Sequence, residues 1–402
     1  MRFVYFTHSL VSDWNHGNAH FLRGVVRELQ ARGHQTRLFE PENGWSRANL
    51  VAAHGEAAVT RFARRFPGMH SATYTRENTD LDAMLEGADV VVVHEWNEPW
   101  LVAAIGRYRS RGGRFLLMFH DTHHRAATAP DELDAFDLDG YDGVLAFGDV
   151  VSEIYRKRGW AREVRTWHEA ADTALFRPHP EIAPIADLIW VGNWGDGERS
   201  AELDAFLLEP VRRLHLSARV HGVRYPAEAL AALARAGIVY GDWLANDRVP
   251  EAFAAHRLTV HVPRGPYART LPGIPTIRVF EALACGIPLV SAPWDDCEGL
   301  FRAGQDFLFA ADGDAMAGKL RALLAEPAAA AALAASGLET IRTRHTCAHR
   351  VDELLAICAA RGRADVGGAG DGAREPVRAH PSDVQLAFGD DDGGAGQRSA
   401  AQ

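Results

Sequence analysis

Residues 271–296 contain the side chains best suited to holding a phosphorylated ligand. Gly273, Ile274 and two prolines predict an irregular loop, and a helix is expected to begin near Thr276, whose hydroxyl can cap it. The unpaired N–H groups of the first helical turn and the positive end of the helix dipole favour a diphosphate. Glu281 falls in the following turns, beside small residues, where a carboxylate can accept both hydrogen bonds of a ribose diol. An ordinary amphipathic helix with a solvated glutamate is the competing interpretation.

A second candidate phosphate site follows the apolar run at residues 188–191. Glycine in the next loop lets the backbone approach phosphate oxygens, and Arg199, near the start of the helix expected next, can pair with them through two hydrogen bonds. Arg264 comes shortly before the loop at residues 271–274 and adds a second guanidinium group. A simple turn explains the glycine-containing loop equally well. That loop begins with Gly192, Asn193 and Trp194.

Polar side chains also follow two buried apolar runs in the N-terminal half. His120 and Asp121 come after the run at residues 115–119, and Glu95 comes after the run at residues 90–93. Because the carboxyl ends of parallel strands face a ligand cleft, these residues are candidates for binding a second substrate or for acid–base chemistry. Several histidines at one strand end raise the question of a metal, but no HExxH pattern completes a site, so no metal is expected. For His120, a structural role is the alternative.

The elements that would position these residues alternate between strands and helices. Continuous apolar runs are typical of strands buried on both faces, and amphipathic helical patterns lie between them. The alternation restarts after the proline-containing stretch at residues 172–183. The sequence therefore predicts an α/β fold with two Rossmann-like parallel-sheet domains that face a cleft. Strands are expected at residues 3–6, 36–39, 90–93, 115–119, 144–147, 188–191, 219–221, 258–262, 288–291 and 307–309, and helices of the second domain at 201–214, 227–236 and 276–284.

The predicted domain boundaries follow from the same alternation. Residues 1–172 form the expected N-terminal domain, and residues 173–360 form the expected C-terminal domain. Residues 361–402 are rich in glycine and aspartate and poor in apolar side chains, so they cannot bury enough surface to offset the entropy of ordering. We expect this segment to be a disordered tail.

Composition and charge exclude several classes of protein. The chain of 402 residues is 47% hydrophobic with a net charge of −10, and its lysines and arginines are spread evenly, so a nucleic-acid partner is not expected. No run of about 18 apolar residues predicts a membrane span. The first apolar run is broken by Thr7 and His8, which argues against a signal peptide. The four cysteines show no CxxC spacing, so neither zinc nor a disulfide framework is expected, and a cytoplasmic location fits best.

Residues 271–296 resemble the donor-site signature of group 1 glycosyltransferases of the GT-B fold, and are similar to family 4 of these enzymes. That signature is a glutamate, seven residues, a second glutamate, alanine, a small residue and then Gly-x-Pro. Glu281 matches the second glutamate, but Gly273 stands where the first is expected, so the acid that contacts the donor sugar in the family is absent. Arg278 and Phe280 complete an Arg-x-Phe-Glu block that resembles the spore-maturation-protein-like branch. The rest of the signature is matched by Ala282, Ala284, Gly286 and Pro288.

Two further segments carry the resemblance. Asp172, Phe176 and Pro178 match the Asn-Gly-Val-Asp, spacer, Phe-x-Pro segment that joins the two domains in the family. This match implies that His168 and Glu169 lie at the floor of the cleft. Residues 189–200 resemble the first loop of the family's C-terminal domain, which supplies a basic residue to the diphosphate.

The resemblance implies a hexosyltransferase-type glycosyltransferase that uses a nucleoside-diphosphate sugar as co-substrate and a hydroxyl acceptor on a small molecule, glycan or protein. It also implies retention of anomeric configuration, with no metal or other cofactor. Two alternatives stay open. A nucleotide-sugar epimerase of the same architecture would use the same donor site, and Gly273 is compatible with a catalytically degenerate nucleotide-sugar-binding protein.

The residues expected to act fall into three groups. The catalytic candidates are His120, Arg199 and Glu281, with His120 as the facilitator of proton transfer. The donor-binding candidates are Gly192, Asn193, Trp194, Arg199, Arg264, Gly273, Ile274, Thr276 and Glu281. The acceptor-side candidates are Gly17, Asn18, Glu95, Asp121, His168 and Glu169.

Overall fold

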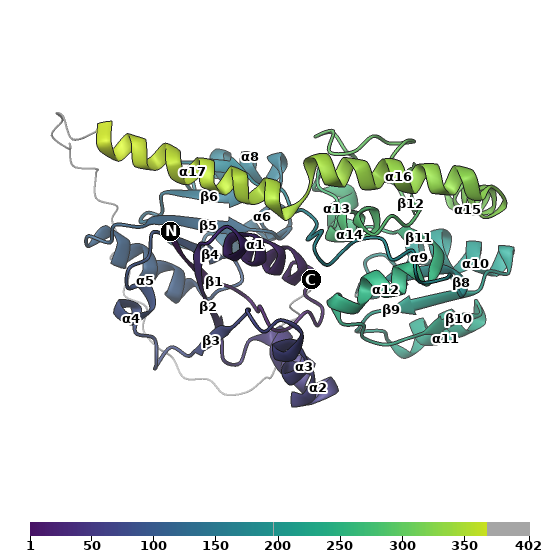
Figure 1. Ribbon diagram of the computed structural model, residues 1–402, viewed down its shortest axis with the longest axis horizontal. Coiled ribbons are helices and arrows are strands. Elements are labelled where there is room, and N and C mark those ends of the chain that lie inside the picture. Colours follow the sequence, from purple (N-terminus) through teal and green to yellow (C-terminus); the bar gives the residue numbers. More distant parts are fainter. Residues whose placement is uncertain (196, 368–402) are drawn as a thin grey trace.

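The structure is a computed structural model that describes residues 1–195 and 197–367. Two α/β domains lie side by side, each built on one twisted parallel sheet (Figure 1). The N-terminal sheet has seven strands in the order β3-β2-β1-β4-β5-β6-β7, and the C-terminal sheet has six in the order β10-β9-β8-β11-β12-β13. This arrangement confirms the predicted fold class.

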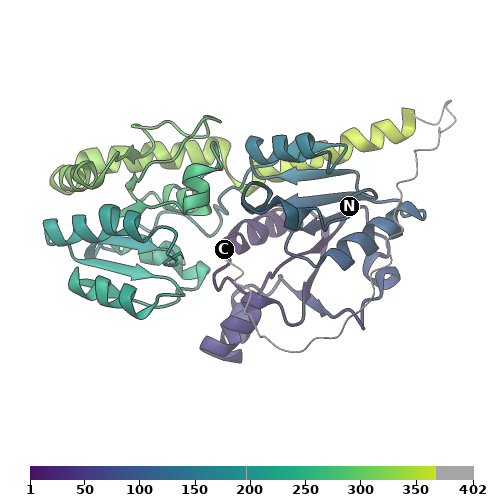
Figure 2. The ribbon, with the colours of Figure 1, turned by 180° about the vertical axis from the view of Figure 1, so that it is seen from behind.

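The N-terminal domain begins with β1 and places helices on both faces of its sheet (Figure 2). Its strands are β1 (Arg2–Phe6), β2 (Gln35–Pro41), β3 (Ser71–Tyr74), β4 (Val90–His94), β5 (Leu116–Asp121), β6 (Gly143–Ala146) and β7 (Val164–Thr166). Its helices are α1 (Ala19–Ala31), α2 (Trp45–His54), α3 (Glu56–Arg65), α4 (Leu81–Leu85), α5 (Pro99–Ser110), α6 (Arg125–Thr128), α7 (Pro130–Leu133) and α8 (Asp149–Arg158).

The C-terminal domain repeats the same layering from β8 onward. Its strands are β8 (Ala186–Val191), β9 (Ala218–His221), β10 (Ile238–Tyr240), β11 (His256–His261), β12 (Leu289–Ser291) and β13 (Leu308–Phe309). The elements that cover the sheet are α9 (Ser200–Leu203), the π-helix η1 (Asp204–Leu208), α10 (Glu209–Leu214), α11 (Ala227–Arg235), the 3₁₀-helix η2 (Asn246–Arg248), α12 (Val249–Ala254), α13 (Gly265–Arg269), α14 (Ile277–Ala284), α15 (Gly313–Ala325) and α16 (Pro327–Arg344).

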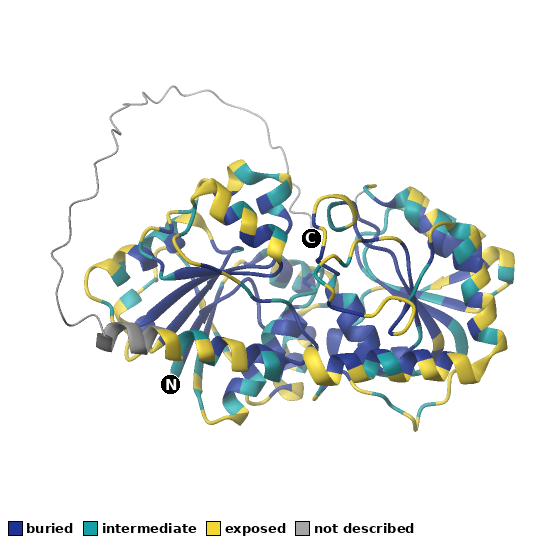
Figure 3. Cartoon of the chain, turned by 90° about the horizontal axis from the view of Figure 1, so that it is seen from above, coloured by how far each residue is buried: buried dark blue, intermediate teal, exposed yellow. Residues whose placement is uncertain are grey.

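The ten predicted strands are all present, and their buried faces form the cores on both sides of each sheet (Figure 3). The strands outside this set, β3, β7 and β10, are short edge strands with exposed positions. They therefore lack the continuous apolar run of a strand covered on both faces. The helix expected at 201–214 is present as an uninterrupted run of α9, the π turn η1 and α10, and Pro210, which has no N–H for an intrahelical bond, lies in the first turn of α10.

The last helix, α17 (Cys347–Gly367), crosses from the C-terminal domain back to the N-terminal domain and packs on α1 (Figure 1). Trp167 donates a hydrogen bond from Nε1 to the carbonyl of Arg350 at 2.9 Å, and a Cβ added at Gly24 would overlap the Cys347 sulfur. Most of α17 belongs to the stretch assigned from sequence to the C-terminal domain, and its end enters the segment expected as a tail. Residues 368–402 of that expected tail lie outside the described residues.

Among the described residues, no single helix is both long enough and apolar enough to cross a membrane. The helices α15 and α16 reach the required length and composition when taken together, but the chain bends by 106° between them.

Candidate functional site

A cleft between the two domains is lined by loops at the carboxyl ends of strands from both sheets. The N-terminal domain contributes residues 13 and 15–18, after β1, and the two residues that follow β5. The C-terminal domain contributes the loops after β8, β9 and β11 and the start of α14. This is the position at which open parallel sheets bind ligands, because helix N-termini and loop side chains converge there.

Arg199 forms a charged wall of the cleft and is almost fully buried. Its guanidinium donates to the carbonyl of Val262 at 2.8 Å and to the side-chain oxygen of Asn193 at 2.9 Å, and lies 5.1 Å from the centre of the Trp190 ring. Burial lowers the pKa of Arg199 to about 10, so the group stays protonated at neutral pH. A fixed cation of this kind can pair with a diphosphate.

Two more arginines line the cleft, and both are paired within the protein. Arg264 donates from Nε to the Glu198 carboxylate, and Arg278, in the first turn of α14, donates to Glu281. Sequence analysis used Arg278 as part of a family motif but left it out of the donor-binding residues. The sequence did contain a signal for Arg278 as a site residue. It precedes Glu281 by three residues on the expected helix, and residues three apart lie on the same helix face.

Glu281 is completely buried and lies behind the wall of the cleft. It accepts hydrogen bonds from His20 Nδ1 and Asn246 Nδ2, both at 2.9 Å, and from Arg278. Burial opposes ionisation, but Arg278 and then His20 outweigh it, so the pKa of Glu281 is lowered. Glu281 therefore joins α14 to α1 and η2. Its assignment to a ribose diol stays a prediction, in which the hydroxyl groups of the ribose would replace one of these hydrogen-bond partners.

The histidine partner of Glu281 has a defined tautomer. His20 Nε2 accepts the backbone N–H of Asp172 at 2.7 Å, so Nδ1 carries the proton donated to the carboxylate. The bond links the two domains, since His20 lies on α1 and Glu281 on α14. His20 and Glu281 are 261 residues apart in the sequence, and no sequence pattern indicated that they are in contact.

The expected capping role of Thr276 is wrong, because its hydroxyl lies 3.0 Å from His261 Nε2 and makes no cap bond in the described part of the chain. Ser291 donates to the carbonyl of Ala292, so its oxygen accepts from His261 Nδ1 at 2.8 Å. His261 Nε2 is then left to accept the Thr276 hydroxyl. Burial lowers the pKa of His261 to about 3, which keeps the ring neutral. The start of α14 faces the cleft without a side-chain cap.

Other donor-binding candidates divide between the cleft and the protein interior. Gly192, Asn193, Arg199, Arg264 and Thr276 line the cleft. Trp194, Gly273, Ile274 and Glu281 lie outside the lining, and their part in donor binding stays a prediction. The reason is tertiary packing. Ile274 inserts into the N-terminal core against Gly148, and Glu298 fills the space beside Gly273, where an added Cβ would overlap its carboxylate.

The acceptor-side candidates divide in the same way. Gly17, Asn18 and Glu169 line the cleft. Glu95 and Asp121 are buried beneath it, where Asp121 accepts from Tyr155 at 2.8 Å and burial raises the pKa of both carboxyls. His168 points instead to Glu298, with 2.5 Å between its Nε2 and the carboxylate. Both placements have one cause: a position near a strand end fixes the backbone, whereas the neighbouring side chains decide where a polar group points. The acceptor-side roles of Glu95, Asp121 and His168 stay predictions.

His120 lies one layer below the cleft, on a second cavity of about 20 Å³, enough for roughly one water molecule. The cavity shares His16, Asn18 and Thr122 with the cleft, and His94 Nε2 lies 2.9 Å from the Thr122 hydroxyl. Burial lowers the pKa of His120 to about 3. The ring is therefore neutral. Its part in proton transfer stays a prediction, in which Thr122, a lining residue of both the cavity and the cleft, would connect His120 to the substrate. Among the described residues, no group of three or more His, Cys, Asp or Glu side chains could hold a metal ion.

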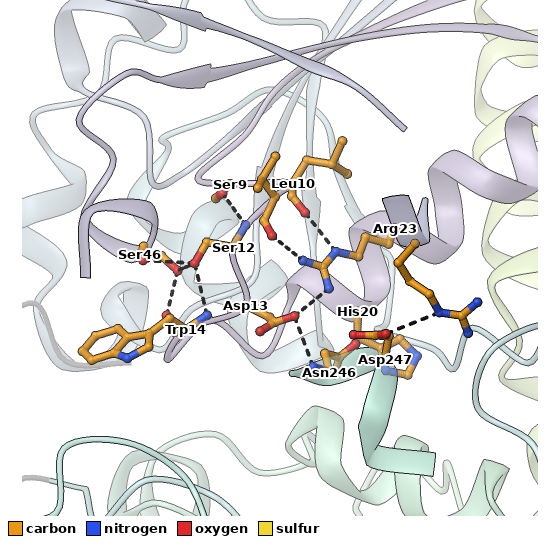
Figure 4. A network of polar contacts seen from close by, with 12 residues as sticks. Ser9, Leu10, Ser12, Asp13, Trp14, His20, Arg23, Ser46, Asn246 and Asp247 are labelled. Atoms are coloured by element: carbon orange, nitrogen blue, oxygen red, sulfur yellow. Dashed lines mark hydrogen bonds and ion pairs between the residues drawn. The ribbon is translucent and has the colours of Figure 1, made fainter. Parts of the chain in front are cut away.

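Asp13 is a further side chain that joins the two domains, and sequence analysis missed it (Figure 4). Asp13 accepts from Arg23 at 2.8 Å, from the backbone of Asn246 at 3.2 Å and from Trp243 Nε1 at 3.1 Å. The available signal was Arg23 within the helical pattern of apolar residues at 21, 22, 25, 26 and 29, because a guanidinium buried by such a helix requires a partner.

Comparisons with known proteins show which protein family and which solved structures this chain resembles. The model of the glycosyl transferase-like family matches residues 199–356. A search of the curated proteins finds no match. Among solved structures, an alpha-glucosyltransferase in complex with UDP and a 13-mer DNA is similar with a TM-score of 0.65 and 10% identity, covering 89% of this chain and 99% of the other.

Two further structures show the same likeness. Sucrose-phosphate synthase from Thermosynechococcus elongatus and HepE from Anabaena, the latter in complex with UDP and glucose, each have a TM-score of 0.62 and 14% identity. Each match covers 90% of this chain and 100% of the other. The chain therefore has the GT-B glycosyltransferase fold.

Proposed function

We propose that this protein is a glycosyltransferase that moves a hexosyl group from a nucleoside-diphosphate sugar to a hydroxyl acceptor. One observation carries the proposal: Arg199, Arg264 and Arg278 converge with the uncapped start of α14 on a cleft between two Rossmann-like domains. The match of residues 199–356 to the glycosyl transferase-like family supports it. UDP is the first nucleotide to test, since HepE is in complex with UDP and glucose.

The chemistry needed at this site is stabilisation of a leaving diphosphate. Negative charge grows on the phosphate oxygens as the bond to the sugar breaks, and prearranged cations and N–H dipoles lower the energy of that state. The three arginines and the helix start supply such groups. We propose on this basis that transfer needs no divalent metal, and from the sequence resemblance that anomeric configuration is retained.

A thermal-shift screen tests donor binding. UDP, GDP, ADP and TDP, each free and as the glucose conjugate, are added to the full chain, and the true donor raises the melting temperature because it binds the native state. The best donor is then incubated with a panel of hydroxyl acceptors, and the product linkage is determined by NMR. We expect a retained linkage and a rate that changes by less than about twofold on addition of EDTA.

The alternatives give different results in the same assay. Interconversion of the donor sugar without an acceptor would identify an epimerase. Binding without transfer or hydrolysis across the panel would identify a nucleotide-sugar-binding protein. Absence of a shift with any nucleotide would contradict the proposal.

A further inference from the structure

Glu169 lines the cleft and belongs to the linker that follows β7. The residue is 4% exposed, and its Oε1 is buried with no hydrogen-bond partner among residues 1–195 and 197–367. Leaving a buried acceptor unpaired costs about 1–3 kcal/mol. Because the Glu169 carboxyl group borders the cleft and its Oε1 has no hydrogen-bond partner among the described residues, it can form a hydrogen bond with a bound ligand.

The backbone around Glu169 is held on both sides. His168, just before it, pairs with Glu298 at 2.5 Å. Ala171, two residues after it, donates to the carbonyl of His345 at 2.9 Å and accepts from the N–H of Cys347 at 2.9 Å. The linker therefore presents Glu169 to the cleft from a fixed position, which lowers the entropic cost of binding.

The groups that face Glu169 come from two helices of the other domain. Glu281 and Arg278 belong to α14, and Tyr267 belongs to α13. Burial raises the pKa of Glu169 to about 8, with a further rise from Glu281 and an opposing effect from Arg278. Near pH 7 the group is a carboxylic acid, with one O–H donor and free acceptor capacity.

We propose that Glu169 contacts the sugar of the bound donor through a hydrogen bond between its carboxyl group and a sugar hydroxyl. The inference rests on the proposed function. The phosphates of a donor suit the arginine groups, whereas a neutral carboxyl suits an uncharged hydroxyl, which both donates and accepts. Gly273 carries no side chain, and the nearby Glu298 is already bonded to His168 and to the N–H of Asp149. Of the two acidic side chains that line the cleft in the described chain, Asp13 is bonded to Arg23, and Glu169 has a carboxyl oxygen available to the sugar.

Calorimetry with the best donor of the screen and with its free nucleoside diphosphate separates the sugar contact from the nucleotide contacts. At pH 7, Glu169→Ala should weaken binding of the nucleotide sugar about tenfold, the effect of one lost hydrogen bond, and change binding of the free nucleotide less than about twofold. Glu169→Gln keeps an N–H donor and should bind the nucleotide sugar within about threefold of wild type.

The pH dependence distinguishes a sugar contact from a structural role. Wild-type affinity for the nucleotide sugar should fall as pH rises through about 8, where Glu169 loses its proton, and this fall should be absent in Glu169→Gln. Asp306→Asn is the control, a buried carboxyl bonded to Arg302 and Thr340 outside the lining of the cleft, and should leave the ratio of the two affinities unchanged.

Each outcome has one meaning. The inference is overturned if Glu169→Ala weakens both ligands equally, or if wild type and Glu169→Gln share the same pH dependence. Should the alanine variant not fold, the comparison of wild type with Glu169→Gln still decides the question. If wild type binds no nucleotide at all, both the proposed function and this inference are contradicted.

Discussion

The two faces of the cleft satisfy their polar groups in different ways. On the C-terminal face, the guanidinium groups of Arg199, Arg264 and Arg278 are all hydrogen-bonded within the protein. On the N-terminal side, a ring nitrogen of His94 and one of His120 are buried without a partner in the described chain. Buried charges need partners more than neutral rings do. The C-terminal face therefore presents three hydrogen-bonded guanidinium groups, whereas the layer beneath the N-terminal face contains neutral rings with unpaired nitrogens among the described residues.

Protonation states follow the same division. Arg199 keeps its charge because even a lowered pKa of about 10 lies well above neutral pH. His8 and His120 are neutral because burial lowers their pKa values to about 4 and about 3. A negatively charged ligand is thus attracted to the C-terminal face, and an uncharged hydroxyl is better suited to the N-terminal face.

The largest effect is expected at the charge pair that joins the domains. Glu281→Ala removes the acceptor of His20, Asn246 and Arg278, and loss of one partner from such a buried pair costs about 3 kcal/mol of folding stability. Urea denaturation measures the loss. If Glu281 also binds the donor ribose, calorimetry should show affinity weaker by about 1–3 kcal/mol.

Two variants sharpen that result. Glu153→Ala removes an exposed carboxylate paired with Lys157 and should cost less than about 1 kcal/mol. Asn246→Ala removes one partner but leaves the Glu281 carboxylate in place. Equal stability of Glu281→Ala and Glu153→Ala would contradict a structural role for the buried pair.

Arg199 should affect the ligand more than the fold. Arg199→Ala is expected to weaken nucleotide binding by about 2 kcal/mol, because a charge-assisted pair with the diphosphate is lost. Calorimetry with the free nucleoside diphosphate measures this change. Arg199→Lys keeps the charge without the planar fork and should recover part of the affinity. Wild-type affinity in the alanine variant would place the diphosphate elsewhere.

Glu169 should make stability depend on pH. Its pKa is raised from 4.5 to about 8, so between these values the folded state holds a proton that the unfolded state has released, and stability falls as pH rises. Glu169→Gln removes this penalty, and its gain over wild type should grow by about 1.4 kcal/mol for each pH unit in this window. Urea denaturation at pH 6 and at pH 7 gives the slope. A gain independent of pH would mean that the carboxyl is ionised throughout.

The smallest effect is expected at His120. Because this ring reaches the cleft only through its neighbours, His120→Asn should lower turnover by less than about tenfold and leave donor affinity unchanged. Initial rates and calorimetry test the two parts separately. A loss of about a hundredfold or more would show direct proton transfer by His120.

Sequence analysis predicted the strands best where each strand is buried on both faces, as β4 is. It failed at β3 and β7, because an edge strand in contact with solvent does not need a continuous apolar run. For the site, glycine and arginine after β8 were sufficient to place Gly192 and Arg199 on the cleft. A carboxylate such as Glu281 could not be placed from sequence, since its partners come from distant parts of the chain.

The sequence by itself determined the strand–helix alternation, and with it the two sheets and the strand ends that border the cleft, because periodicity and burial act over a few residues. Tertiary structure decided which of those polar groups are available to a ligand. Glu281 and Glu169 are both buried glutamates near the cleft, yet the first is paired with His20 and the second has an uncommitted oxygen among the described residues. That difference depends on packing between domains, which sets both the hydrogen-bond partners and the protonation state of each carboxyl group.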